Sequence, residues 1–443
     1  MPHPSITAET YPHKPAFIMG ASGEMVTYRQ LDDRSNQAAQ LFRSLGLKPG
    51  DHVGMMLENN RQFLEIIWAA QRAGIIYTPI STHLKKDETA YILENCGATM
   101  FIGSHALAEV AEELIVEPGS VEHFYMVGGI RPGFESWEEA TDRQPVERIA
   151  DECNGAAMLY SSGTTGKPKG AVHVQEAVVA HAATGRFALD LKPGDIYWCT
   201  ADPGWVTGTS YGIISPLVNR VTMIVDEAEF DLDRWYGTLQ NEGVQVWYTA
   251  PTAIRMLMRA GKDAAKGYDF TKLRFLASVG EPLNPEAVVW GHDVFGKPFH
   301  DNWWQTETGG IMIANTAEMD IHPGSMGKPL PGIKAGIVTV QDGSVKLCKP
   351  GEIGELALRP GWPSMMRAYL HEQARYDKCF VDGWYLSGDL AMQDKDGYFW
   401  FVGRADDLIK SSGHLIGPFE VESALIEHEA IAEAAVIGIP DET

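Results

Sequence analysis

The sequence predicts an α/β fold, in which a large N-terminal domain of layered sheets and helices with a small β-rich subdomain precedes a truncated C-terminal α+β subdomain. Three observations predict this class. Short apolar runs such as 52–57 (HVGMML) and 75–80 (IIYTPI) alternate with helical periodicity and are separated by Pro and Gly. The same alternation recurs at 221–225, 244–250 and 273–280. From about residue 325, short β segments with frequent glycines replace it.

The organisation along the chain predicts two units of unequal size. Residues 1–405 are expected to form the large domain, with 325–405 as its β-rich subdomain. The boundary falls at 403–413 (GRADDLIKSSG), where two aspartates precede a Ser-Ser-Gly turn. The helical pattern at 420–434 and the apolar run after it are too short to bury their own surface. We therefore expect 406–443 to be the incomplete beginning of a C-terminal subdomain.

The charge balance argues against two classes of binding partner. Among 443 residues, 36 Lys and Arg face 59 Asp and Glu, which gives a formal net charge of −23. Nucleic acid and anionic membranes both need basic side chains, so we expect neither as a partner. Five scattered cysteines without a CxxC pair predict free thiols, and no apolar run approaches the length of a membrane span. The chain is therefore expected to be cytoplasmic; the sequence makes no prediction of its oligomeric state.

A phosphate-binding loop is the strongest local signal. Residues 159–170 (LYSSGTTGKPKG) pass from a β-like run into Ser, Thr, Gly and two lysines. Small residues let backbone N–H groups approach phosphate oxygens, and lysines add positive charge. The string is not a Walker A loop, because Pro168 follows Gly166 and Lys167 where Ser or Thr is required. The predicted polyphosphate ligands are Thr164, Thr165, Gly166 and Lys167.

This loop resembles that of the adenylate-forming superfamily, which includes acyl-CoA synthetases, luciferases and peptide-synthetase adenylation domains. Further strings resemble the family in the expected order: YTAPT (248–252), GEP (280–282), DNWWQTETG (301–309), YLSGD (385–389) and GRADD (403–407). From about residue 196 the chain is most similar to acetyl-CoA synthetases, whereas before about residue 155 it resembles fatty-acyl and aryl-CoA ligases. The resemblance implies an AMP-forming acid–thiol ligase that uses ATP, Mg²⁺ and coenzyme A to activate a small carboxylate, acetate first and propionate second.

The resemblance also implies the nucleotide site. Glu307 would bind the Mg²⁺ of MgATP, with the hydroxyls of Thr306 and Thr308 beside it as hard oxygen donors. Thr306 would contact the α-phosphate, and Lys167, Thr306 and Glu307 are the expected catalytic residues. Asp389 and Arg404 suit the ribose and phosphate ends of the nucleotide. The wall of the adenine and ribose site would consist of Gly280, Glu281, Pro282, Asp301, Asn302, Trp303, Trp304, Gln305 and Thr306.

The resemblance further implies an acyl pocket that is closed by an indole ring. Trp304 would lie across it and leave room for one or two carbons, and Val206, Thr207 and Val279 match the other lining positions. Trp303 beside it is read as a core aromatic as well as a wall residue. Towards the C-terminus, Asp406 is the expected hinge, and Ser412 and Gly413 are expected to line the coenzyme A approach. A cation would bind near His428, through the backbone carbonyls of Ile426 and Ile431.

Two departures from the family pattern leave alternatives open. Leu415 stands where family members usually carry an Arg that reaches the nucleotide phosphate, and no counterpart of the family's C-terminal catalytic Lys follows before Thr443. We therefore expect adenylate formation to be impaired. One alternative is a medium-chain or aryl-acid CoA ligase, which the N-terminal third favours. The other is a catalytically silent nucleotide-binding fragment.

Overall fold

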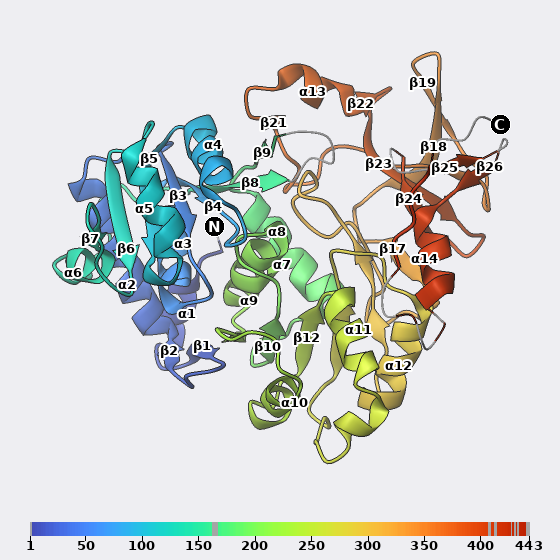
Figure 1. The fold of residues 1–443 in the computed structure, drawn as a ribbon, viewed down its shortest axis with the longest axis horizontal. Coiled ribbons are helices and arrows are strands. Elements are labelled where there is room, and N and C mark those ends of the chain that lie inside the picture. Colours follow the sequence, from blue (N-terminus) through green and yellow to red (C-terminus); the bar gives the residue numbers. More distant parts are fainter. Residues whose placement is uncertain are drawn as a thin grey trace.

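The computed structural model describes residues 2–161, 167–405, 409–411, 414–426, 428, 431 and 434–439. Three large sheets and a two-stranded ribbon make up its β structure, and helices pack between and around them. Figure 1 shows the blue-to-cyan strands β3–β7 on one side, the yellow-to-red elements on the other, and the green strands β10 and β12 between them. This arrangement confirms the predicted α/β class of layered sheets and helices.

The first sheet has eight strands in the order β21-β9-β8-β4-β3-β5-β6-β7, and the predicted runs 52–57 and 75–80 form its parallel centre. Local signals delimit its helices: the Asn60 side chain accepts from Phe63 N at the start of α3, and Gly74 ends that helix with φ 70°. The strands are β3 (His52–Met56), β4 (Ile76–Pro79), β5 (Ala98–Ser104), β6 (His123–Val127), β7 (Glu135–Ser136), β8 (Ala156–Ser161), β9 (Lys169–Val172) and β21 (Ala368–Tyr369). The helices are α2 (Tyr28–Ser44), α3 (Arg61–Ala73), α4 (Lys86–Cys96), α5 (Ala108–Val116) and α6 (Trp137–Asp142), with a 3₁₀ turn at His105–Leu107.

The second sheet has seven strands in the order β14-β13-β12-β10-β11-β1-β2, so the later apolar runs do not continue the first sheet. All residues of β11, β12 and β13 are buried, which explains their continuous apolar character. The strands are β1 (Pro15–Met19), β2 (Met25–Thr27), β10 (Ile196–Cys199), β11 (Thr222–Val225), β12 (Val246–Thr249), β13 (Phe275–Ser278) and β14 (Phe299–His300). The helices of this region are α1 (Pro4–Thr10), α7 (Ala177–Ala188), α8 (Val206–Thr209), α9 (Ser215–Val218), α10 (Leu232–Asn241), α11 (Pro251–Arg259) and α12 (Pro285–Phe295), with a π-helical turn at Ser210–Ile214 and a 3₁₀ turn at Lys262–Ala265.

The third sheet is antiparallel, in the order β15-β16-β17-β24-β23-β20-β18-β19, and β22 pairs with β23. Most of it lies in the region predicted to be β-rich, although β15 and β16 precede residue 325. Within that region β21 is an exception, because it pairs with β9 of the first sheet. The elements are β15 (Asn302–Trp303), β16 (Ile313–Ala314), β17 (Ser325–Pro329), β18 (Ala335–Gln341), β19 (Ser344–Leu347), β20 (Ile353–Leu358), β22 (Phe380–Val381), β23 (Trp384–Gln393), β24 (Phe399–Arg404) and α13 (Gln373–Lys378).

The described C-terminal residues form a ribbon of β25 (Ile409–Ser411) and β26 (His414–Ile416), followed by α14 (Pro418–Ile426). This helix is shorter than the pattern at 420–434 predicts. All five cysteines are free, as expected from their spacing. Within the described ranges, no helix combines the length and the apolar character that crossing a bilayer requires.

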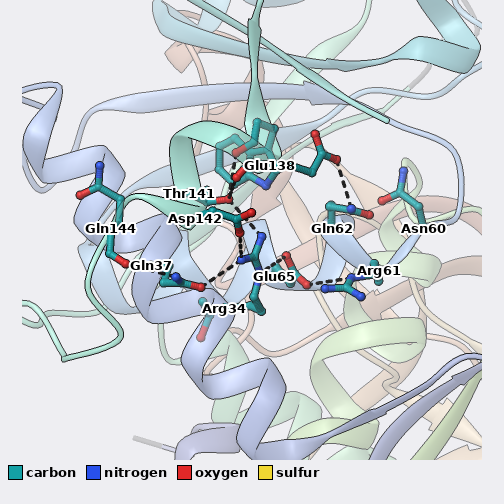
Figure 2. Close-up of polar contacts among 12 residues, drawn as sticks. Arg34, Gln37, Asn60, Arg61, Gln62, Glu65, Glu138, Thr141, Asp142 and Gln144 are labelled. Atoms are coloured by element: carbon teal, nitrogen blue, oxygen red, sulfur yellow. Dashed lines mark hydrogen bonds and ion pairs between the residues drawn. The ribbon is translucent and has the colours of Figure 1, made fainter. Parts of the chain in front are cut away.

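An ion-pair network around the buried Glu65 ties three helices of the N-terminal region together (Figure 2). Glu65 on α3 is 1% exposed, and its carboxylate lies 3.5 Å from Arg34 Nε on α2 and 3.3 Å from Arg61 Nε. Arg34 also reaches Asp142 on α6, with Nη1 2.5 Å from Oδ1. Burial raises the pKa of Glu65, and the two arginines counteract the rise. The network therefore fixes the packing of α2, α3 and α6 at a distance from the predicted site.

Candidate functional site

A cavity of about 490 Å³ opens between the second and third sheets. Its floor follows the carboxyl ends of the parallel strands β13 and β14, where α/β proteins commonly bind ligands, and its other wall comes from β17, β23 and β24. Two lining residues were missed by the sequence analysis, Met326 and Phe401. The others are the predicted ones, namely Val206, Thr207, Val279, Gly280, Glu281, Pro282, Asp301, Asn302, Trp303, Trp304, Gln305, Thr306, Asp389 and Arg404.

The loop after β13 is shaped by local geometry. Gly280 has a φ of 96°, a conformation that favours glycine, and this turns the chain along the cavity wall. The Glu281 carboxylate points to α11, where it accepts from Thr252 Oγ1 at 2.8 Å and from Arg255 Nη2 at 2.8 Å. The strings 248–252 and 280–282 are therefore joined by these side chains, and Glu281 fixes the loop to the helix.

Asp389 is fixed by donors on one of its oxygens. Trp303 Nε1 donates to Oδ2 at 2.8 Å and Gln305 Nε2 donates to the same oxygen at 2.9 Å. Arg404 Nη1 lies 3.3 Å from the other oxygen, Oδ1. Tyr385 OH donates to Gln305 Oε1 at 2.8 Å and so orients the amide. Burial raises the pKa of Asp389, which the Trp303 hydrogen bond and the Arg404 charge counteract.

Asp301 and Asn302 occupy the floor of the cavity. Asp301 is buried, and this desolvation raises the pKa of its carboxyl to about 8 even though Asn302 N donates to Oδ1 at 2.9 Å. Asn302 is oriented from both sides, since Tyr248 OH donates to its Oδ1 at 3.0 Å and its Nδ2 donates to Ser278 O at 2.8 Å. The floor therefore combines a carboxyl group whose neutral form is favoured by burial with a fixed amide.

The residues predicted to form the acyl wall all line this cavity. The Trp304 indole packs edge-on against the Tyr211 ring, with 5.0 Å between centroids and an interplanar angle of 77°. Tyr211 is buried, and its hydroxyl accepts from Ile311 N at 2.7 Å and lies 2.7 Å from Thr184 Oγ1. Trp304 is thus held by a side chain that is itself fixed. Val206, Thr207 and Val279 line the same cavity.

Glu307 directly follows Thr306, the last residue of this segment that lines the cavity. It lies in a turn whose backbone is hydrogen-bonded to a residue outside the turn. Met366 N donates to Glu307 O at 3.0 Å, and Tyr369 OH donates to Glu307 Oε1 at 2.7 Å. Burial and the Glu307 charge raise the pKa of Tyr369, so its hydroxyl stays protonated. Among the residues that the structure describes, no hydrogen bond or ion pair involves Oε2 of Glu307. A carboxylate oxygen of this kind fits a hard divalent cation.

Thr308 does not offer its hydroxyl to that cation, contrary to the expectation from its position beside Glu307. Its side chain is fully buried, and Oγ1 accepts from Gln305 N at 2.9 Å and lies 3.0 Å from Gly310 O. The turn uses this hydroxyl to stabilise its own backbone. Trp362 Nε1 and Ser364 Oγ both donate to Thr308 O at 2.8 Å, which adds to the rigidity of the turn.

The structure describes residues 159–161 and 167–170 of the predicted phosphate loop. Lys167 is exposed, and its Nζ lies 4.7 Å from the centre of the Tyr91 ring on α4, outside the lining of the cavity. Lys169 begins β9, and its Nζ lies 5.2 Å from the centre of the Tyr369 ring. The predicted residues Thr164, Thr165 and Gly166 lie outside the described residues.

The C-terminal predictions are only partly within the described residues. Asp406, Ser412 and Gly413 lie outside them. His428 is exposed, and its backbone carbonyl accepts from Ile431 N at 2.8 Å. No group of three or more His, Cys, Asp or Glu suited to a metal occurs in the part of the chain that is described. A cation bound through the carbonyls of Ile426 and Ile431 stays a prediction.

Comparison of the sequence and the structure with known proteins points to one family. Residues 5–370 match the family model of AMP-binding enzymes, and residues 420–443 match that of the AMP-binding enzyme C-terminal domain. The acetyl-coenzyme A synthetase of Bacillus subtilis (strain 168) is 44% identical over 94% of this chain and 74% of that protein. That of Methanothrix thermoacetophila is 38% identical over 94% of this chain and 68% of its own. The crystal structure of the anthranilate CoA ligase AuaEII in complex with anthranoyl-AMP superposes with a TM-score of 0.90 at 29% identity, over 99% of this chain and 84% of that one.

Proposed function

Since the chain belongs to the AMP-binding enzyme family, we propose that it is an AMP-forming short-chain acyl-CoA synthetase whose first acid is acetate and second propionate. A carboxylate oxygen attacks the α-phosphorus of ATP, the bond to the bridging oxygen breaks, and pyrophosphate leaves with the electron pair. The sulfur of coenzyme A then attacks the carbonyl carbon of the acyl-adenylate, the thiol proton is released, and AMP leaves.

The cavity residues have separate tasks in this proposal. Asp389 accepts from the ribose hydroxyls through Oδ1, Arg404 meets the phosphate end, and Thr306 contacts the α-phosphate. Mg²⁺ bound at Glu307 would supply positive charge that offsets the repulsion between the two anions. Three roles stay predictions from the sequence. They are phosphate binding by Thr164, Thr165, Gly166 and Lys167, the hinge at Asp406, and the coenzyme A contacts of Ser412 and Gly413. The five free thiols favour a cytoplasmic enzyme.

The observation that carries the choice of acid is the position of Trp304. Its indole lies on the cavity lining with Val206 and Thr207 and packs against the buried Tyr211. Because Tyr211 is itself fixed by hydrogen bonds, the indole cannot retreat without disturbing a buried network. A longer chain or an aromatic ring on the acid would collide with it, so the acyl site favours one or two carbons.

A substrate panel tests the proposal. ATP–pyrophosphate exchange is measured with acetate, propionate, butyrate, octanoate and benzoate, and thioester formation is measured separately from acetyl-adenylate and coenzyme A. We expect acetate to give the highest kcat/KM in the first assay and acetyl-CoA to form in the second. If no acid gives pyrophosphate exchange and acetyl-adenylate gives no acetyl-CoA, while MgATP still binds in calorimetry, the catalytically silent alternative is favoured.

The second candidate is an aryl-acid or medium-chain CoA ligase. Two observations favour it: the structural likeness to the anthranilate CoA ligase, and the resemblance of the chain before about residue 155 to fatty-acyl and aryl-CoA ligases. Benzoate or octanoate exceeding acetate in kcat/KM in the same panel would support this candidate and reject the gatekeeping role of Trp304.

A further inference from the structure

We propose that Tyr369 is a positioning residue that fixes one oxygen of Glu307 and so presents the other oxygen to the magnesium of MgATP. No string that predicts the site from sequence includes Tyr369, and it does not line the cavity. The inference rests on the proposed function, because the cation belongs to the nucleotide substrate.

The contact between the two side chains divides the carboxylate into an occupied and an open oxygen. Tyr369 OH donates to Oε1 of Glu307 at 2.7 Å, and the Tyr369 residue is only 5% exposed. Within the described ranges, Oε2 has no hydrogen-bond or ion-pair partner. A carboxylate held at one oxygen keeps a fixed plane, and its second oxygen is left for a hard cation.

Tyr369 is itself held by the strand that leaves the phosphate loop. It lies in β21, which pairs antiparallel with β9, and Tyr369 is opposite Ala171 in that ladder. Lys169, at the start of β9, places its ammonium group 5.2 Å from the centre of the Tyr369 ring. The ring therefore links the strand after the phosphate loop to the acidic turn.

Residues 366–369 hold Glu307 through both its backbone and its side chain. Met366 N donates to Glu307 O at 3.0 Å, three residues before the tyrosine that reaches the carboxylate. A position fixed at two points leaves the carboxylate little rotational freedom. Loss of the outer partner of a metal-binding carboxylate typically weakens metal binding by about 10- to 100-fold.

The variant Tyr369→Phe removes the hydroxyl and keeps the ring that lies under Lys169. The matched control is Tyr376→Phe on α13, where the ring packs against Phe380 with 4.8 Å between centroids. ATP affinity is measured by calorimetry in EDTA and at a series of Mg²⁺ concentrations. For Tyr369→Phe we expect the affinity in EDTA to stay within about 2-fold and the gain from Mg²⁺ to fall about 10-fold. The control should keep the full gain.

The ATP affinities with Mg²⁺ and in EDTA are measured on the same variant. Their ratio therefore does not change when part of the protein is unfolded. A gain from Mg²⁺ equal to that of the unchanged chain would overturn the role of Tyr369. A fall of the EDTA affinity alone would also overturn it, since that outcome indicates a structural role in the phosphate loop.

Glu307→Gln separates this inference from the proposed function. If Glu307→Gln abolishes the gain from Mg²⁺ and Tyr369→Phe leaves it intact, only the inference about Tyr369 fails. If Glu307→Gln keeps the gain, Glu307 does not bind the magnesium, so its role and that of Tyr369 both fail, whereas the proposed activity is still decided by the substrate panel. Acetate-dependent pyrophosphate exchange across the Mg²⁺ series gives a second readout, in which Tyr369→Phe should raise the half-saturating Mg²⁺ concentration while kcat at saturating Mg²⁺ changes less.

Discussion

Trp303 donates its indole N–H to Asp389 Oδ2 at 2.8 Å, across 86 positions of sequence. The same oxygen accepts from Gln305, so the donors leave Oδ1 turned to Arg404 and the cavity. Two adjacent tryptophans therefore have different surroundings: Trp304, the proposed gatekeeper of the acyl site, packs against Tyr211, whereas Trp303 orients the carboxylate predicted to bind the ribose.

The first prediction concerns this hydrogen bond. Trp303→Phe keeps an aromatic ring but removes one donor to a buried carboxylate, which is worth about 1.5 to 3 kcal/mol. We expect AMP affinity to fall about tenfold in calorimetry, and 2′-deoxy-AMP affinity to fall less because it lacks one ribose hydroxyl. Trp400→Phe is the control, since Trp400 Nε1 donates to Asp394 at 2.9 Å outside the cavity lining. Equal losses for the two nucleotides would contradict an action through Asp389.

The second prediction concerns acyl-chain length. Trp304→Gly removes the indole that lines the cavity and packs against Tyr211, which enlarges the proposed acyl site. We expect kcat/KM for four- to six-carbon acids to rise and that for acetate to fall, because each methylene accommodated is worth about 1 to 3 kcal/mol. The measurement is acid-dependent pyrophosphate exchange over the series from acetate to hexanoate. An unchanged order of preference with the fold intact would reject Trp304 as the gatekeeper.

The third prediction is a pH dependence of stability set by Asp301. Its folded pKa of about 8 lies above the usual value of 3.8, so between about pH 4 and 8 the folded state binds a proton that the unfolded state has lost. The free energy of unfolding therefore decreases as pH rises through this window, by at most about 1.4 kcal/mol per pH unit from this group. Below the window the contribution is fully present, and above it the contribution is lost.

Asp301→Asn removes the pH-dependent contribution of this carboxyl to the free energy of unfolding. In denaturation of the nucleotide-free protein, the variant should therefore gain stability relative to the unchanged chain as pH rises from 5 to 8. Asp389, whose pKa is also raised, contributes equally to both proteins and cancels in the difference. Parallel pH profiles of the two proteins would show that the Asp301 carboxyl ionises in the folded state as it does in water.

The ordered strings in the sequence predicted most of the cavity because they follow strands whose carboxyl ends meet. Val279 follows β13 and Asp301 follows β14, and parallel pairing brings these ends together. Tyr369 could not be found in this way: its partner Glu307 is 62 positions away, and the contact depends on β21 leaving the β-rich region to pair with β9. No local pattern encodes which sheet a two-residue strand joins.

Apolar wall residues were missed for a different reason. Met326 lies in β17 (SMGKP) and Phe401 lies in β24 (FWFVGR), strands whose apolar side chains are equally typical of a sheet core. Nothing in such a pattern distinguishes a side chain that faces a ligand from one that faces another sheet. The hydroxyl of Thr308 shows the opposite error, because its position beside Glu307 suggested a ligand although the turn consumes it in its own hydrogen bonds.

The last prediction concerns the buried ion pairs of Figure 2. Arg34→Gln leaves the carboxylate of Glu65, which is 1% exposed, with Arg61 as its remaining arginine partner within the described network. Because breaking a buried pair leaves charge uncompensated, we expect the free energy of unfolding to fall by about 3 kcal/mol. Arg29→Gln on the same helix removes an exposed pair with Asp33 and should cost less than about 0.5 kcal/mol.

The two variants are compared by thermal and urea denaturation, with the KM for ATP measured below the transition. KM should be unchanged in both, since the network lies outside the cavity lining. Equal stability of Arg34→Gln and Arg29→Gln would mean that Glu65 takes up a proton when Arg34 is removed. That outcome would appear as a stronger pH dependence: the raised pKa of Glu65 would rise further, and the Arg34→Gln protein would lose more stability than the unchanged chain as pH increases.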